Sequence, residues 1–293
     1  MRLQNKINDQ TKDAWIFILP IVLGTILFSF YPVIFSLVAS LSNWDGFERW
    51  DYIGLENFKK LLNDRYFLTA VKNTFVFTFV SVPISMALGM LVAVIVNKKI
   101  FFTTFYRTAF FIPSIASTVA IGLVFGLILV PNAGLLNSLL AQIGIKGPDW
   151  LGTSKWAMPS VIFVQVWLVT GYNMTVYIGG LQGIPDTLYE AAVIDGASDS
   201  QQFFRITVPL LSPTSFFLMI TSIISSFQVF NLIHVMTNGG PAFATTTYIH
   251  YLYLNAFSYF RMGYASAQAW ILFIVLVVIT LSQKAVEKRW VYY

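Results

Sequence analysis

"AVKNTFVFTFVSVPISMALGMLVAVIV", residues 70–96, is the stretch that decides the fold, because its only charged side chain is Lys72. A helix of about 20 predominantly apolar residues crosses the hydrocarbon core of a bilayer. This stretch is long enough, and Lys72 lies close enough to one end to extend its ammonium group to the interface. The stretch therefore predicts a membrane-spanning α-helix.

Further apolar stretches reach the same length. Together they give six expected spans, at 14–41, 70–96, 105–130, 157–180, 210–235 and 263–282. The composition agrees, since 11% of the residues are charged, against about 25% in a soluble domain. The first stretch contains Pro20 and Pro32 and no small-residue cleavage site follows it, so we expect a span rather than a signal peptide. The sequence predicts an all-α integral membrane protein with six transmembrane helices.

Lysine and arginine residues beside the spans predict the orientation, because they are enriched in cytoplasmic loops. The short connections "NKK" at 97–99 and "KAVEKR" at 284–289 carry them on the same side of the expected membrane. The loop at 42–69 also holds several, but it contains five acidic residues that offset them. We therefore expect an N-in, C-in topology.

The spans and their orientation define the expected organisation. It comprises a cytoplasmic tail at 1–13, a first transmembrane helix at 14–41, an extracytoplasmic cap loop at 42–69, a transmembrane core at 70–283 and a cytoplasmic tail at 284–293. Within the cap, "NWDGFERWDYIGLENFKKLL" (43–62) predicts a turn followed by an amphipathic helix that starts near Leu55.

Several kinds of chemistry are excluded by what the sequence lacks. It has no cysteine and no G-x-x-x-x-G-K-[ST] phosphate loop, so thiol chemistry and the common mode of ATP binding are absent. The two histidines are His234, expected as a lone hydrogen-bonding group at the outer end of the fifth span, and His250, in or near an outer loop. They offer neither a catalytic pair nor a metal site, and no basic run favours nucleic-acid binding. We expect neither an enzyme nor a protein that binds a metal or cofactor.

Energy coupling within the chain alone is also disfavoured. Ion-coupled carriers usually keep ionisable groups at membrane depth, whereas the central part of the six spans contains no Asp or Glu. Backbone carbonyls can bind sodium, so an ion-coupled secondary carrier stays as an alternative. Otherwise a separate subunit supplies the energy from the cytoplasmic side.

The stretch "IPDTLYEAAVIDGASDSQQFFRITVP", residues 184–209, is a charged break between two apolar stretches, and we call it the elbow. Pro185 suits the first position of a helix, and Gly196 suits the left-handed residue that ends one. Ser198 and Gln201 have the spacing of a capping box. The sequence therefore predicts two short helices joined at Gly196, with Pro209 at the start of the fifth span.

The charge of the elbow indicates what it binds. Residues 181–204 contain four acidic residues and no lysine or arginine. A helix that lies on an anionic membrane surface is usually basic. We therefore expect the elbow to dock into a basic groove of another protein, through a face that includes Leu188, Ala191, Ala192 and Asp195.

The elbow resembles the E-A-A-x-x-x-G-x9-I-x-L-P signature of permease subunits of binding-protein-dependent ABC importers. The matching residues are Glu190, Ala191, Ala192, Gly196, Ile206 and Pro209. Val208 stands where leucine is typical. Residues 52–78 and the loop "TNGGPAFATTTYIHYLYLNAF" (237–257) resemble the carbohydrate branch, which includes the maltose and glycerol-phosphate permeases.

The resemblance covers roughly residues 15–282 and implies both fold and partners. The fold is a five-helix ABC importer core, here the second to sixth spans, preceded by one N-terminal helix. The implied partners are a second homologous permease subunit in a heterodimer, two ATPase subunits that bind ATP and Mg, and an extracytoplasmic solute-binding protein. The implied location is the cytoplasmic membrane of a prokaryote, with no cofactor bound by this chain.

The resemblance also suggests a mechanism. Closure of the ATPase subunits on ATP would pull the two elbows together, tilt the fifth span and turn the cavity outward, and hydrolysis would reverse the change. The residues expected to carry this coupling are Leu188, Glu190, Ala191, Ala192, Asp195 and Gly196.

Polar and aromatic side chains on two spans are expected to line the substrate path. They are Gln165, Tyr172 and Asn173 on the fourth span, and a stripe of Thr221, Ser225, Gln228 and Asn231 on the fifth. Such groups would bind sugar hydroxyls and stack on sugar rings, or they would only join helices by hydrogen bonds.

The sequence thus predicts the permease subunit of an ATP-driven importer that moves a sugar or oligosaccharide by alternating access. The alternatives are the ion-coupled carrier and an ABC importer for a non-sugar solute such as a polyol or glycerol phosphate.

Overall fold

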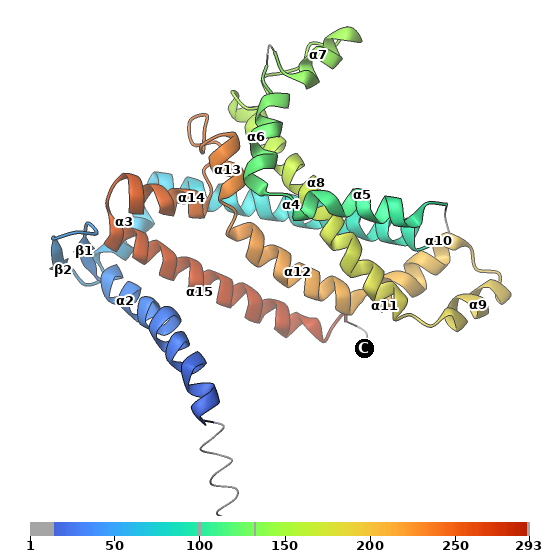
Figure 1. Ribbon diagram of the computed structural model, residues 1–293, viewed down its shortest axis with the longest axis horizontal. Helices are drawn as coiled ribbons and strands as arrows, with labels where there is room; N and C mark the ends of the chain where they lie inside the picture. The colour runs from blue at the N-terminus through green and yellow to red at the C-terminus, as the bar shows by residue number, and fades with distance from the viewer. Residues whose placement is uncertain (1–14, 99–100, 132, 292–293) are drawn as a thin grey trace, which may run out of the picture. The chain divides into compact units, whose positions relative to one another are not determined.

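The computed structural model describes residues 15–98, 101–131 and 133–291, and it is built almost wholly from α-helices (Figure 1). The expected tail at 1–13 and Lys99 lie outside these residues. Internal contacts divide the described chain into two compact parts. The first part comprises residues 15–63 and 252–274, and the second comprises residues 64–251 and 275–291.

In the described residues, four helices are long and apolar enough to cross a membrane. They are Trp15–Ser40, which includes η1 (Ile26–Phe30) and α2 (Tyr31–Ser40), then α4 (Arg65–Asn97), α8 (Ser154–Gln182) and α15 (Met262–Glu287). Two bent helix pairs raise the number to six if each pair is one span. The expectation of an all-α integral membrane protein is confirmed, and the count of six depends on these two pairs.

The first part carries the chain's one described sheet. Strands β1 (Ser42–Trp44) and β2 (Trp50–Tyr52) are antiparallel, with Trp44 opposite Trp50. The turn between them contains Gly46, whose φ of +98° suits glycine. Helix α3 (Glu56–Asn63) follows, one residue after the predicted start. The buried Asn57 donates from Nδ2 to the backbone oxygens of Ser40 and Ser42, each at 2.9 Å, and so joins α3 to the hairpin.

The segment after α14 (Tyr248–Tyr253) returns to this first part through η3 (Leu254–Ser258). The first half of α15 belongs here too, and its Trp270 donates from Nε1 to Ser36 Oγ on α2 at 3.2 Å.

Helices α4 and α8 form the centre of the second part, with α12 (Ser212–Phe227) beside them (Figure 1). Helix α4 begins at Arg65, five residues before the expected span, because Asp64 accepts hydrogen bonds from the backbone N–H groups of Tyr66 and Phe67. Small residues let the helices approach closely, as transmembrane packing requires. A Cβ placed on Gly89 of α4 would lie 2.6 Å from Cβ of Asn173 on α8.

The expected third span, 105–130, is wrong as a single helix. The structure has α5 (Thr103–Ile115) and α6 (Thr118–Ile128), bent by 97°. Pro113 removes a backbone donor in the last turn of α5, and Ala116 and Ser117 are extended, with ψ of 150° and 121°. Helix α7 (Leu135–Gln142) follows α6.

The expected fifth span, 210–235, is also wrong in its bounds. Helix α12 ends at Phe227, and α13 (Asn231–Met236) starts after Phe230, whose φ and ψ are −135° and −61°. The fully buried Leu232 and Ile233 place α13 in a core with residues of α8, and Val235 contacts Gly122 of α6. Packing of this short helix decides where α12 ends.

Candidate functional site

A polar cavity of about 190 Å³ lies among α4, α8 and α12, and we call it the polar cavity. Five of the residues predicted for the substrate path line it, namely Gln165, Tyr172, Asn173, Thr221 and Ser225. Helices α8 and α12 bring them together although they lie about 50 residues apart in the sequence. The predicted roles of these residues remain predictions.

The other two predicted residues do not line the polar cavity. Gln228 caps the C-terminus of α12, and Asn231 is the first residue of α13; both are exposed. The expected stripe assumed a continuous helix from Thr221 to Asn231. Because the helix ends at Phe227, the stripe is broken after Ser225.

Sequence reasoning missed the contribution of α4. Ser81 and Ser85 line the polar cavity, and Ser226 Oγ on α12 donates to Thr78 Oγ1 on α4 at 2.9 Å beside it. The signal was present, because Ser81 and Ser85 are four residues apart in an otherwise apolar helix and therefore share a face.

The break between α5 and α6 borders a second cavity of about 210 Å³. Ser114, Ala116 and Thr118 line it from the break, and Gln165 and Tyr172 line it from α8. These two α8 residues also line the polar cavity, so they stand where the two cavities meet. Broken helices at membrane depth commonly border binding sites in transporters, and Pro113 was the available sequence signal.

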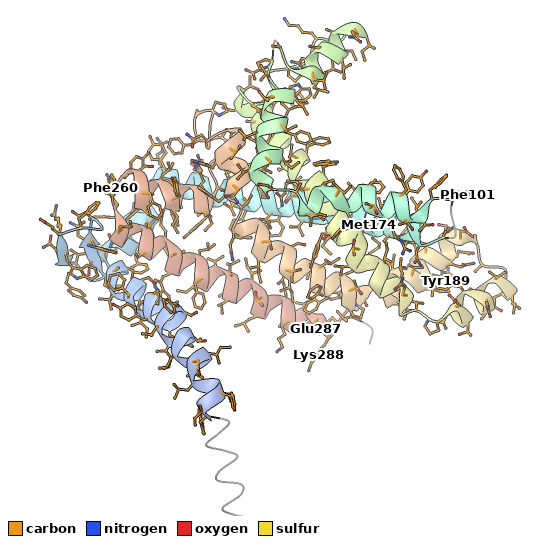
Figure 2. All side chains as sticks on the ribbon, viewed as in Figure 1. Phe101, Met174, Tyr189, Phe260, Glu287 and Lys288 are labelled. Carbon is orange, nitrogen blue, oxygen red and sulfur yellow. The ribbon has the colours of Figure 1, made fainter. Side chains whose placement is uncertain are left out.

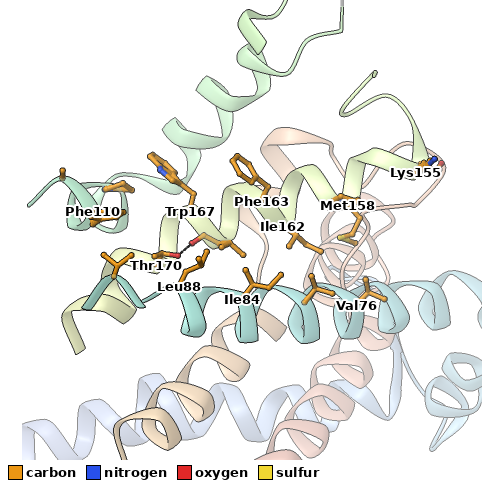
Figure 3. Close-up of a pocket in the computed structure, with 17 residues that line it drawn as sticks. Val76, Ile84, Leu88, Phe110, Lys155, Met158, Ile162, Phe163, Trp167 and Thr170 are labelled. Atoms are coloured by element: carbon orange, nitrogen blue, oxygen red, sulfur yellow. Dashed lines mark hydrogen bonds between the residues drawn. The ribbon is translucent and has the colours of Figure 1, made fainter. Parts of the chain in front are cut away.

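A larger groove of about 820 Å³ is different in chemistry (Figure 3). Aliphatic and aromatic side chains of α4, α5 and α8 line it, with Val76, Ile84 and Phe110 among them, and Lys155 lies at one end. Such a surface suits hydrocarbon or apolar side chains rather than hydroxyl groups.

The elbow forms as the sequence predicts in most respects. Helix α9 (Asp186–Ile194) is followed by Gly196 with φ of +75°, and Ser198 and Gln201 form the capping box. Two details differ. Pro185 is the N-cap of α9 and not its first helical residue. The second elbow helix runs through α10 (Asp199–Gln202), η2 (Phe203–Thr207) and α11 (Val208–Leu210), so the 62° bend into α12 comes at Leu211, after Pro209.

The predicted coupling residues lie together at the surface of the elbow. Leu188, Glu190, Ala191, Asp195 and Gly196 are exposed, and Ala192 is half-buried. None of the residues of α9 is buried. Sequence reasoning missed Ile194, whose exposed fraction of 86% is unusual for a large apolar side chain.

One of two polar contacts attaches the elbow to α4, and the other joins the two helices of the elbow to each other. Lys98 Nζ at the end of α4 lies 2.9 Å from Asp199 Oδ2 on α10, and the hydroxyl groups of Tyr189 and Thr207 lie 2.9 Å apart. Figure 2 labels Tyr189, which lies on the elbow, and Met174, which lies on α8. The elbow is therefore joined to α4 as well as to α12.

Most of the sequence matches a known family of proteins. A family model described as "binding-protein-dependent transport system inner membrane component" matches residues 69–292. The chain belongs to this family. It is a permease component of a binding-protein-dependent ABC transporter and a multi-pass membrane protein, and the permease is not the transporter's catalyst.

The permease is similar to bacterial proteins along nearly its full length. It is 37% identical to the probable ABC transporter permease protein YurN of Bacillus subtilis, over 94% of this chain and 96% of YurN. It is 33% identical to the sn-glycerol-3-phosphate transport system permease protein UgpA of Agrobacterium fabrum, over 94% of each. It is also 33% identical to the arabinooligosaccharides transport system permease protein AraP of Bacillus subtilis, over 91% of this chain and 86% of AraP.

A solved structure shares the permease's fold. It is a chain of a bacterial alginate ABC transporter in complex with an alginate pentasaccharide-bound periplasmic protein. The TM-score is 0.86 at 25% identity, and the match covers 99% of this chain and 98% of that one. The resemblance to ABC importer permeases is confirmed.

The permease also contains a histidine pair outside the helices that qualify as spans. His234 Nδ1 on α13 lies 3.5 Å from His250 Nε2 on α14, and the ring of Phe230 stacks on both imidazoles. His234 is therefore not the lone residue that the sequence suggested. His250 is fully buried, and burial, together with the nearby His234, lowers its pKa to about 4. It is neutral at physiological pH and serves packing and hydrogen bonding.

Proposed function

We propose that this permease is the subunit through which an ATP-driven importer moves a sugar or oligosaccharide across the cytoplasmic membrane of a prokaryote. The observation that carries the proposal is the polar cavity, where hydroxyl and amide side chains of three helices meet next to Tyr172. The names of AraP and of the alginate transporter, which refer to saccharides, support it. Membership of the ABC permease family does not favour the ion-coupled carrier.

The proposed complex contains a second, homologous permease, two ATPase subunits and an extracytoplasmic solute-binding protein. ATP and Mg bind to the ATPase subunits, and this chain binds no cofactor. We place both termini and the elbow in the cytoplasm, with the cap loop at 42–69 outside and the transmembrane core at 70–283. The acidic, exposed surface of α9 supports this assignment, because it suits a basic groove on a soluble partner.

Coupling follows from how the elbow is attached. A pull on α9 reaches α12 through the helical path from Asp199 to Leu210, and the exposed ion pair between Lys98 and Asp199 adds a weaker connection to α4. Both helices border the polar cavity. A rigid movement of the elbow therefore changes the walls of the cavity, which is the requirement for alternating access.

The test is solute-stimulated ATP hydrolysis and uptake by the complete complex in proteoliposomes, with its binding protein and a solute panel. At Gly196 a Cβ would meet open space, so a substitution acts through the backbone alone. Gly196→Val places a β-branched residue at a positive φ, whereas Gly196→Asn is tolerated there. We expect Gly196→Val and Glu190→Lys to uncouple ATP hydrolysis from uptake, and Gly196→Asn to behave like the wild type. Normal uptake by the Gly196→Val complex and by the Glu190→Lys complex would exclude coupling through the elbow.

A further inference from the structure

The walls of the polar cavity contain unused hydrogen-bonding groups. Asn173 is 1% exposed, and both its Nδ2 and its Oδ1 are without a partner. Ser81 is 2% exposed, and its Oγ is also without a partner. Buried polar groups are nearly always hydrogen-bonded, and each exception requires an explanation. Because both residues line the cavity, a bound molecule is the partner that would satisfy them.

Neighbouring hydroxyl groups show the contrast. Ser85 Oγ donates to the backbone oxygen of Val82 at 3.0 Å, and Ser226 Oγ donates to Thr78 Oγ1. These side chains stabilise α4 and its contact with α12. Asn173 and Ser81 make no such bonds, so helix joining alone does not explain them.

The packing of α4 against α8 holds Asn173 in place. Gly89 presents no side chain to it, and a Cβ there would lie 2.6 Å from Cβ of Asn173. This close approach of Gly89 fixes the position of the Asn173 side chain in the wall of the cavity.

The chemistry of these groups selects a class of ligand. An amide offers two N–H donors and a carbonyl acceptor, and a serine hydroxyl both donates and accepts. A sugar hydroxyl also does both, so two adjacent hydroxyl groups match an amide and a serine. Every residue that lines the polar cavity is uncharged. An anionic group placed there would be buried without a compensating cation, which is costly at membrane depth.

We infer that Asn173 and Ser81 form a subsite that binds adjacent hydroxyl groups of an uncharged sugar ring, so that this permease transports a neutral saccharide and not a phosphate ester or a uronate. A volume of about 190 Å³ is below the roughly 300–1,000 Å³ of a site that encloses a drug-sized ligand. The polar cavity therefore takes one ring or the edge of one. The inference rests on the proposed function, and it identifies the substrate class for the same site.

The first experiment measures ATP hydrolysis and uptake by the complete wild-type complex with its binding protein. The panel contains neutral oligosaccharides, oligosaccharides of uronic acids and sn-glycerol 3-phosphate. We expect stimulation by a neutral saccharide only. If only a uronate, or only the phosphate ester, stimulates ATP hydrolysis and uptake, the inference is wrong. No stimulation by any saccharide would overturn the proposed function as well, so the two failures are distinguishable.

The second experiment tests the residues. It compares the transported neutral saccharide with analogues that each lack one ring hydroxyl, in the wild-type, Asn173→Ala and Asn173→Asp complexes. Loss of the recognised hydroxyl should lower wild-type uptake at least tenfold but change uptake by the Asn173→Ala complex less than twofold, because the side chain that bound it is gone. Equal losses in all complexes would overturn the role of Asn173. The affinity of the isolated binding protein for each analogue is measured separately, and the uptake values are corrected for it. The Asn173→Asp complex serves as the second variant if the alanine variant does not assemble.

Discussion

The polar cavity and the elbow display opposite kinds of side chain. In the cavity, polar groups such as Asn173 are hidden without hydrogen-bond partners. On the elbow, apolar side chains such as Leu188 and Ile194 are exposed, with no residue of α9 buried. Each is a departure from ordinary packing, and each indicates a missing component. A buried polar group indicates a small ligand, whereas an exposed apolar helix in an acidic segment indicates a protein partner.

The largest effect is expected on the elbow, where an aspartate in place of Leu188 should remove an apolar anchor from the interface. Because a few buried anchors dominate interface energies, we expect Leu188→Asp to lower recovery of the ATPase subunits with the permease at least tenfold. Quantitative co-purification measures this. The control is Ile145→Asp, which changes a similarly exposed residue outside the elbow. An intact complex with Leu188→Asp would mean that the exposed apolar surface is not an interface.

His250 is buried like the polar groups of the cavity, but it can take up a proton. The stability of the folded protein should therefore depend on pH. The pKa of His250 is about 4 in the folded protein and about 6.5 in an unfolded chain. As pH falls from about 6.5 to 4, the unfolded state takes up a proton that the folded state does not, so stability falls by up to about 3 kcal/mol.

The thermal midpoint of the purified permease between pH 7.5 and 4.5 measures this effect. The matched variant is His250→Gln, which keeps a polar side chain and does not titrate. Its midpoint should fall less steeply over the same range. Equal slopes would show that other groups control the acid sensitivity.

A methyl group added at Gly89 tests whether the cavity depends on close helix approach. Gly89→Ala puts a Cβ against Asn173, and overpacking of this kind typically costs about 1–3 kcal/mol. We expect a lower thermal midpoint and reduced uptake, with co-purification of the ATPase unchanged. Gly126→Ala on α6 is the control, since nothing lies within 4 Å of the added Cβ. If both variants behave alike, the approach of α4 to α8 does not position the amide.

The smallest effect is expected for the ion pair between Lys98 and Asp199, because both side chains are largely exposed and water and salt screen such pairs. Lys98→Gln should leave the thermal midpoint unchanged and alter coupled ATP hydrolysis less than twofold. Hydrolysis at several salt concentrations checks this. A severe loss would show that this contact transmits most of the movement to α4.

The sequence was sufficient for features that depend on local chemistry. The apolar run at 70–96 predicted α4, and the spacing of Ser198 and Gln201 predicted a capping box that the structure contains. Gly196 was expected in a left-handed conformation and has φ of +75°. Each of these depends on a few consecutive residues, so no knowledge of tertiary packing was needed.

Features that depend on distant residues could not be predicted in the same way. The end of α12 at Phe227 follows from burial of Leu232 and Ile233 against other helices, and hydropathy alone does not distinguish this from a continuous span. The contact between Lys98 and Asp199 joins residues far apart in the sequence. The contribution of Ser81 required knowing which face of α4 meets α8 and α12.

The interruption between α12 and α13 has a consequence for hydration. The carbonyl oxygen of Val229 accepts a hydrogen bond from Thr247 Oγ1 at 3.1 Å, so a side chain replaces a helical donor there. Irregular backbone at membrane depth persists only inside protein or beside water. Acyl chains therefore do not cover this segment, and protein or solvent does. Amide exchange with deuterated solvent should accordingly be faster at residues 228–230 than in the middle of α12.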